Sequence, residues 1–186
     1  EAMLEPRLRK QALRIFRAAL DASDPVVAVR RHVRLDGSTL VAGGRRYDLD
    51  GFERVIVLGA GKAGAAMAKA VEGILGRRVT TGLVNVKYGH LARLRRVELN
   101  ECGHPVPDEA GVRGASRIAA LAREAGPRDL VICLFSGGAS ALLPSPAAPI
   151  RLEEKQATTR HSSWASKVLM EPSRFAMVLS NAVFPA

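Results

Sequence analysis

The order of hydrophobic and polar positions predicts alternating strands and helices from Arg54 onward. Four runs have the composition of strands, at 54–58, 79–86, 95–101 and 129–135. The stretches 61–75 and 108–125 instead carry apolar residues at helical spacing. Such alternation is typical of a parallel sheet covered by helices on both faces. The pattern therefore predicts an α/β fold, a three-layer Rossmann-like domain with a mainly parallel sheet, over residues 1–160.

The residues before Arg54 predict two helices and a hairpin. Apolar residues recur at helical spacing between Leu8 and Leu20, and the stretch 21–25 ends this helix and caps a short second one, with proline near its first position. The runs 33–35 and 39–41 flank Asp36-Gly37, a turn pair whose glycine tolerates positive φ. A proline-rich connector at 144–149 leads to a helix that begins near Leu152.

Composition narrows the classes of function. The chain has 186 residues and a net charge of +10, which attracts anionic ligands. Aromatic residues make up only 4% and are not interleaved with basic stretches, so we expect no specific nucleic-acid binding. The two cysteines, Cys102 and Cys133, indicate neither a disulfide framework nor a metal site. No apolar run approaches the roughly 20 residues that span a membrane, and we expect a cytoplasmic protein.

The first loop of chemical interest is Gly59-Ala60-Gly61-Lys62-Ala63-Gly64, which follows the strand 54–58. Backbone N–H groups at Gly59, Gly61 and Gly64 can approach an anion. The spacing matches the dinucleotide fingerprint, but Lys87 stands where that site needs an acidic residue, and the lysine position does not fit a Walker A motif. Two interpretations stay open. Either the glycines only permit a tight turn, or Lys62 neutralises a phosphoryl group in transfer.

The second loop, Ser136-Gly137-Gly138-Ala139-Ser140, follows the apolar strand 129–135. It lacks the glycines of a nucleophile elbow, so Ser136 and Ser140 are predicted to bind a ligand rather than attack one. The amides of Gly137 and Gly138 could hold a carboxylate or a phosphate. Right-handed crossovers place both loops at the carboxyl edge of the sheet, where open α/β folds bind ligands.

The segment His104-Pro105-Val106-Pro107-Asp108 is made rigid by its two prolines. Asp108 is a good N-cap for the helix that follows. His104 is interpreted as a residue that organises its loop more readily than as a base. The other histidines are dispersed, without the spacing of metal ligands.

Four motifs together resemble the glycerate 2-kinase family, the ATP-dependent group with a MOFRL segment. These motifs are Leu58 to Ala63, Gly103 to Glu109, Ser136 to Leu142, and Leu152 to Arg160. The resemblance implies transfer of the γ-phosphoryl group of ATP to the 2-hydroxyl of D-glycerate, with Mg²⁺, in a cleft between two domains.

The same resemblance implies roles for individual residues. Lys62 matches the loop lysine and is expected to stabilise charge on the transferring phosphoryl group. The loop Ser136–Ser140 matches a binding loop of the same cleft, and whether it holds the carboxylate of glycerate or a phosphate of ATP stays open. His104 and Asp108 match a segment expected to line the cleft.

The resemblance ends at Arg160, and we expect residues 161–186 to form a divergent, poorly ordered tail. The chain then corresponds to the front of a longer, two-domain family and is truncated relative to it. Because phosphoryl transfer depends on both walls of the cleft, we expect negligible kinase activity from this chain alone. The alternative is a non-catalytic module that binds a nucleotide or sugar phosphate and acts through an oligomer or a partner that supplies the missing domain. An NAD-dependent oxidoreductase is disfavoured by the missing acidic residue.

Overall fold

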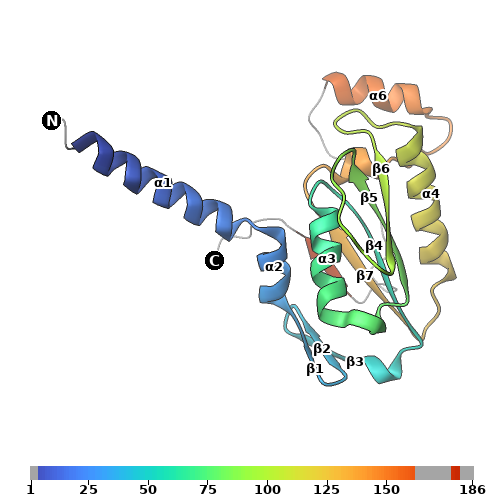
Figure 1. The fold of residues 1–186 in the computed structure, drawn as a ribbon. Helices are drawn as coiled ribbons and strands as arrows, with labels where there is room; N and C mark the ends of the chain where they lie inside the picture. Colours follow the sequence, from blue (N-terminus) through green and yellow to red (C-terminus); the bar gives the residue numbers. More distant parts are fainter. Residues whose placement is uncertain (1–3, 162–176, 181–186) are drawn as a thin grey trace.

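A parallel β-sheet forms the centre of the computed structural model, which describes residues 4–161 and 177–180 (Figure 1). Its strands are β4 (Arg54–Ala60), β5 (Thr81–Lys87), β6 (Val97–Cys102), β7 (Asp129–Phe135) and β8 (Met177–Ser180). They lie in the order β6-β5-β4-β7-β8, and every neighbouring pair is parallel. The chain order along the sheet thus reverses between β4 and β7, as it does at the ligand-binding switch point of Rossmann folds.

Helices cover both faces of this sheet, as Figure 1 shows for α3 (Gly64–Leu75) and α4 (Glu109–Glu124). Successive strand residues alternate between two cores, because side chains of a strand point to opposite faces. Val55 and Val57 pack in the core that contains α3, whereas Ile56 and Leu58 pack with Ile118 of α4. The predicted three-layer α/β architecture is confirmed.

A small antiparallel sheet precedes the central one. It consists of β1 (Val33–Asp36), β2 (Thr39–Ala42) and β3 (Arg45–Asp48). The predicted hairpin is confirmed, but its turn is Gly37-Ser38 rather than Asp36-Gly37, because Asp36 is still paired with Thr39. Gly37 has a φ of +58°, which a glycine adopts without strain.

Two helices lead into this small sheet. The second, α2 (Pro25–His32), begins where predicted, and Asp24 Oδ1 accepts hydrogen bonds from the N–H groups of Val26 (2.7 Å) and Val27 (3.1 Å). The first, α1 (Leu4–Ala22), projects away from the rest of the molecule (Figure 1). Its apolar side chains are exposed, and they include Ile15 at 72%.

Short elements complete the described chain: η1 (Leu49–Gly51), η2 (Gly76–Arg78), α5 (Ala139–Leu142) and α6 (Leu152–His161). Among the described residues, no helix combines the length and apolar character needed to span a membrane. The expectation of a poorly ordered tail concerns residues that mostly lie outside the described ones. Within that tail the structure describes only the last residue of α6 and the edge strand β8.

Candidate active site at the carboxyl edge of the sheet

The two glycine-containing loops meet between the carboxyl ends of β4 and β7. The N–H group of Lys62 donates to the carbonyl oxygen of Gly137 at 3.0 Å, and the N–H group of Ala63 donates to Ser136 Oγ at 3.0 Å. In the other direction, the N–H group of Ser136 donates to the carbonyl oxygen of Ala60 at 3.2 Å. The loops therefore form one unit at the carboxyl edge of the sheet, as predicted, and this place is the topological switch point between β4 and β7.

The first loop uses its N–H groups inside the protein. Besides those of Lys62 and Ala63, the N–H group of Gly61 donates to the carbonyl oxygen of Asn85 (3.1 Å), and that of Gly64 donates to the carbonyl oxygen of Gly61 (3.0 Å). An amide that is already bonded is a poor donor to a ligand. The expectation that this loop cradles an anion through its glycine amides is thus not supported by its hydrogen bonds.

Close packing explains the three glycines of this loop. A Cβ atom at Gly59 would overlap the carbonyl oxygen of Leu134, and one at Gly61 would overlap Ser136 Oγ. At Gly64 it would lie 2.8 Å from Val84 Cγ1. The structure favours the interpretation of a tight turn for the glycines, and Lys62 is the exposed residue of the loop.

The second loop has free donors. The N–H groups of Gly137, Gly138 and Ser140 have no acceptor among the described residues. Gly137 and Ser140 are exposed, whereas Ser136 Oγ is already bonded to the first loop. Of the two loops, the second is the one that can present amides to an anionic group.

The side chains of Lys62 and His104 both lie close to Gly138. A Cβ atom at Gly138 would be 2.7 Å from His104 Nε2 and 3.3 Å from Lys62 Cγ. Lys62 is exposed, and its Cε atom also lies near Gly137. The structure therefore brings the predicted lysine, the predicted histidine and the second loop together.

The surroundings of His104 keep its imidazole neutral. Burial lowers the pKa of His104, and the positive charges of Lys62 and Lys87 lower it further. Lys87 ends β5 opposite Cys102, and the carbonyl oxygen of Lys87 accepts a hydrogen bond from the N–H group of His90 at 2.9 Å. Sequence reasoning did not select Lys87 and His90 as site residues. Their position at and just after the end of β5 could have placed them at the carboxyl edge of the sheet.

Asp108 is occupied by structural hydrogen bonds. Its Oδ1 accepts from the N–H group of Gly111 at 2.9 Å, and its Oδ2 accepts from the hydroxyl of Tyr88 at 2.8 Å. Burial alone would raise the pKa of Asp108, but the N–H groups of Gly103 and Gly111 and the Tyr88 hydroxyl hold it below its ordinary value. The predicted N-cap is confirmed, and the expected role of Asp108 in lining the cleft stays a prediction.

Asn85, a buried residue that the sequence did not single out, links β5 to the helices α4 and α5 beside the site. Asn85 is fully buried, and its Nδ2 donates to the carbonyl oxygens of Leu142 (2.7 Å) and Gly111 (3.3 Å). Its Oδ1 accepts from Asn100 Nδ2 at 3.0 Å. A buried asparagine needs such hydrogen-bond partners. The single polar residue in the apolar run 83–86 could therefore have predicted a buried hydrogen-bond network at this position.

Other chemistry is not favoured at this edge. Burial raises the pKa of Cys102 and of Cys133 to about 12, so neither thiol is a nucleophile at neutral pH. Within 4–161 and 177–180, no group of three His, Cys, Asp or Glu side chains could hold a metal ion.

Comparison with known proteins assigns the chain to a family. Residues 11–163 match the model described as "Domain of unknown function (DUF4147)". The chain belongs to this family. It is 36% identical over 157 residues to a glycerate 2-kinase of Pyrococcus horikoshii, an alignment that covers 84% of this chain and 35% of that enzyme. The resemblance to glycerate 2-kinases is thereby confirmed.

Two further similarities extend this result. A putative hydroxypyruvate reductase of Agrobacterium vitis is 38% identical over 154 residues, which cover 82% of this chain and 32% of the relative. The fold matches the crystal structure of a Pyrococcus horikoshii protein with a TM-score of 0.72 and 36% identity, over 82% of this chain and 34% of the other. The chain spans about a third of the length of the curated relatives that it matches.

Proposed function

We propose that this chain supplies one wall of a glycerate kinase-type active site, which transfers the γ-phosphoryl group of ATP to the 2-hydroxyl of D-glycerate. The observation that carries the proposal is the convergence of Lys62, His104 and the free amides of the second loop at the switch point. The similarity to a glycerate 2-kinase supports the substrate class.

The second loop is the proposed anion-binding element. An oxygen of a phosphate placed over Gly137 and Gly138 would meet free N–H donors and the ammonium group of Lys62. The first loop contributes indirectly, because its internal hydrogen bonds fix the backbone from which Lys62 extends. We therefore assign Lys62 to stabilising charge on the phosphoryl group.

His104 is proposed to orient a reacting oxygen. A neutral imidazole offers one N–H donor and one acceptor nitrogen, so it can hold a hydroxyl group without adding repulsion beside Lys62. For Mg²⁺, both oxygens of Asp108 already accept hydrogen bonds, from the Tyr88 hydroxyl and from the N–H group of Gly111. We assign no magnesium ligand to these residues.

The alternative function is a phosphate-binding module that acts only with a partner or as an oligomer. The coverage of about a third of each relative favours keeping this alternative. The name of one relative suggests a reductase, a class of enzyme that often uses a nicotinamide cofactor. Against it, β5 ends in Val86-Lys87 and offers no carboxylate for the ribose hydroxyls.

The test combines binding with turnover. A calorimetric titration of the purified chain with ATP measures the binding affinity. Lys62→Ala should weaken this affinity by about tenfold, because it removes one charge-assisted hydrogen bond. Lys10→Ala, on the exposed face of α1, is the matched control and should leave the affinity unchanged. A coupled assay for 2-phosphoglycerate then shows whether the chain also turns over.

Three outcomes separate the candidate functions. ATP binding that needs Lys62, without turnover, supports a kinase wall that requires further residues. Turnover lost in Lys62→Ala would show that the chain suffices and would refute the expectation of negligible activity. Equal ATP affinities for the lysine variant and its control, or reduction of hydroxypyruvate by NADH, would overturn the kinase proposal.

A further inference from the structure

A groove of about 950 Å³ lies at the end of the molecule away from the two loops. It is formed by α2, by the second half of α3 and by the segment 93–96, which leads into the amino end of β6. Because the candidate active site is at the carboxyl edge of the sheet, the groove is a separate place on the molecule.

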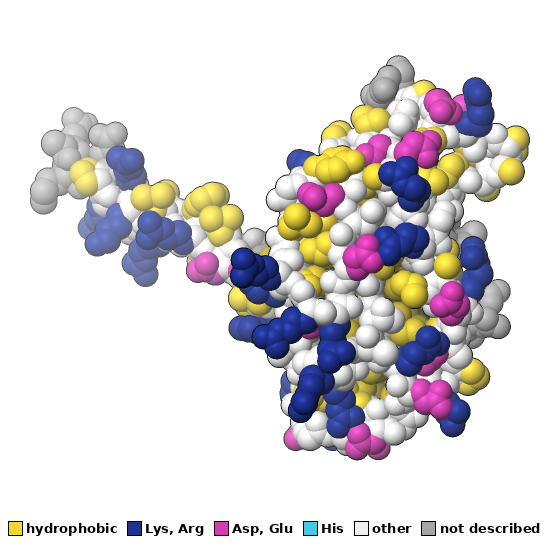
Figure 2. Space-filling view, turned by 45° about the vertical axis from the view of Figure 1, so that its right-hand side comes forward, with side chains coloured by type: hydrophobic (Ala, Val, Ile, Leu, Met, Phe, Trp, Pro, Cys, Tyr) yellow, Lys and Arg dark blue, Asp and Glu magenta, His cyan; other side chains and the backbone are white. Residues whose placement is uncertain are grey.

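Cationic side chains dominate the lining of this groove. They are Arg30, Lys69, Arg77, Arg93, Arg95 and Arg96, and all six are exposed. None of them forms an ion pair among the described residues, whereas Arg54, Arg78, Arg117 and Arg128 each pair with a carboxylate. Figure 2 shows Lys and Arg side chains gathered where α1 joins the body of the molecule.

One acidic residue, Glu72, lines the same groove and holds the backbone of the segment 93–96 through hydrogen bonds. Its exposed fraction is only 9%, and its Oε1 accepts from the N–H groups of Arg95 (2.7 Å) and Arg96 (3.1 Å). Its Oε2 is buried without a hydrogen-bond partner among the described residues. Glu72 thus fixes the backbone of Arg95 and Arg96 against α3, so that less backbone conformational entropy is lost when this segment binds a ligand.

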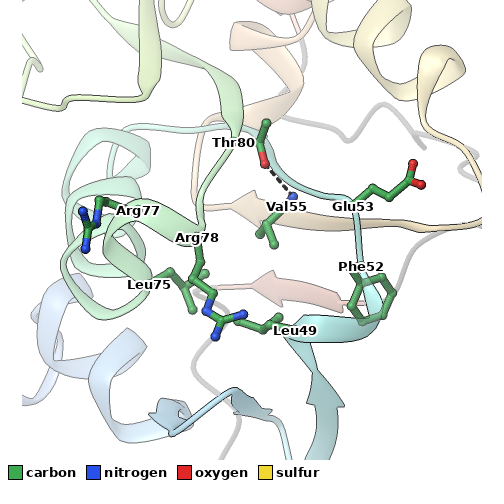
Figure 3. A pocket seen from close by; sticks show the side chains of 8 residues that line it. All are labelled: Leu49, Phe52, Glu53, Val55, Leu75, Arg77, Arg78 and Thr80. Carbon is green, nitrogen blue, oxygen red and sulfur yellow. Dashed lines mark hydrogen bonds between the residues drawn. The ribbon is translucent and has the colours of Figure 1, made fainter.

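A neighbouring pocket of about 530 Å³ is also lined by arginines, and it differs from the groove in how they are paired. Figure 3 shows its lining, which includes Leu75, Phe52 and two arginines. Arg78 is neutralised by Asp50 at 2.5 Å, whereas Arg77, which also lines the groove, lies on the far side of Leu75 from Phe52. Of the two arginines that line this pocket, only Arg77, which also lines the groove, has no ion pair among the described residues.

We propose that the groove binds a compact polyphosphate, that is, two or more linked phosphate groups of a nucleotide or of an inorganic chain. Guanidinium groups bind phosphate oxygens through paired N–H donors, and six cations face a single carboxylate here. The lining contains no aromatic side chain on which bases could stack, which favours a small polyphosphate over single-stranded nucleic acid.

The experiment is a calorimetric titration of the full chain with tripolyphosphate, in the Lys62→Ala background so that the carboxyl edge contributes less. In this background, Arg93→Ala/Arg96→Ala should weaken binding by about 100-fold, since each arginine is expected to contribute about tenfold. Arg9→Ala/Arg14→Ala on α1 removes the same charge and should weaken binding by less than about threefold, because exposed distant charges are screened by salt. Circular dichroism confirms that each variant is folded.

Further titrations identify the ligand. Tripolyphosphate that binds as tightly as ATP supports recognition of the phosphate chain alone, and tighter binding of ATP supports a nucleotide as the source. Equal losses of tripolyphosphate affinity in the two double variants would overturn the assignment of binding to the groove. A single-stranded oligonucleotide that binds more tightly than tripolyphosphate, and that requires Arg93 and Arg96, would overturn the ligand class. Neither result depends on whether Lys62 acts in phosphoryl transfer.

Discussion

Gly138 lies in close contact with both His104 and the side chain of Lys62 in the candidate active site. It has a φ of +90° and serves as the N-cap of α5. The absence of a side chain allows the imidazole to approach the loop, and it leaves the N–H groups of Gly137 and Gly138 accessible. One residue thus couples the backbone conformation of the loop to the position of the histidine.

Substitution of Gly138 by alanine should therefore damage both stability and binding. The left-handed backbone costs an L-residue roughly 1–2 kcal/mol, and the new Cβ atom would lie 2.7 Å from His104 Nε2. We expect the free energy of unfolding to fall by about that amount, with weaker ATP binding as the histidine is displaced. Urea titration and calorimetry measure the two effects.

Gly137→Ala is the control for this prediction. Its φ is not positive, and the nearest atom to a new Cβ would be Lys62 Cε at 3.9 Å. It should change the free energy of unfolding by less than about 0.5 kcal/mol. If the two alanine variants behave alike, Gly138 does not hold the position assigned to it.

The sequence predicted which residues meet at the site better than it predicted what each one does. Lys62 and the second loop follow parallel strands, and strand ends of this kind share one edge. The hydrogen bonds of the first loop depend on carbonyl groups of Asn85 and Gly137, which are distant in sequence. No local pattern reveals such partners, so a cradle of free amides was expected where the amides are in fact bonded.

At the scale of elements, long periodic segments were predicted well and short polar ones were not. The strand β7 was expected at 129–135 and is found there, and α4 differs from its expected range by one residue at each end. The strand β3 was missed because Arg45-Arg46-Tyr47-Asp48 has no apolar alternation and is held by its ladder with β2. The four-residue helix α5 is too short for a helical period to be visible.

The packing of α4 on the sheet depends on a glycine at its centre. A Cβ atom at Gly114 would overlap both Asn85 Oδ1 and Asn100 Nδ2, which hydrogen-bond to each other. Because these amides also bind carbonyl groups of α4 and α5, the helix cannot move away without breaking their bonds. This contact fixes the distance between one helical layer and the strands that carry the site.

Two glycine-to-alanine substitutions in helices should therefore act in opposite directions. Gly114→Ala should lower the free energy of unfolding by about 1–3 kcal/mol, through overpacking and lost hydrogen bonds. Gly73→Ala in α3 meets nothing within 4 Å and should raise it by about 0.5–1 kcal/mol, since alanine restricts the unfolded chain. Urea titrations followed by circular dichroism test both. Unchanged stability in Gly114→Ala would contradict this account of α4, and a loss of stability in Gly73→Ala would contradict the open space assigned to that position of α3.

For the whole molecule, the two ends of the sheet have different chemistry. The carboxyl edge gathers free amides, Lys62, Lys87 and the imidazole of His104, whose pKa is lowered. The amino end gathers unpaired arginines around a buried carboxylate, which suits an extended charge. The helix α3 connects the two places, since it starts beside Lys62 and its last residues border the groove.

The exposed helix α1 gives a test of the arrangement as a whole. Ile15 of α1 is 72% exposed, whereas Ile56 of β4 is fully buried. Ile15→Ala should change the free energy of unfolding by less than about 0.5 kcal/mol, whereas Ile56→Ala should lower it by about 2–5 kcal/mol because it leaves a cavity. Urea titrations at two protein concentrations measure this difference. A large, concentration-dependent loss for Ile15→Ala would instead mean that the apolar face of α1 is covered by another copy of the chain in solution.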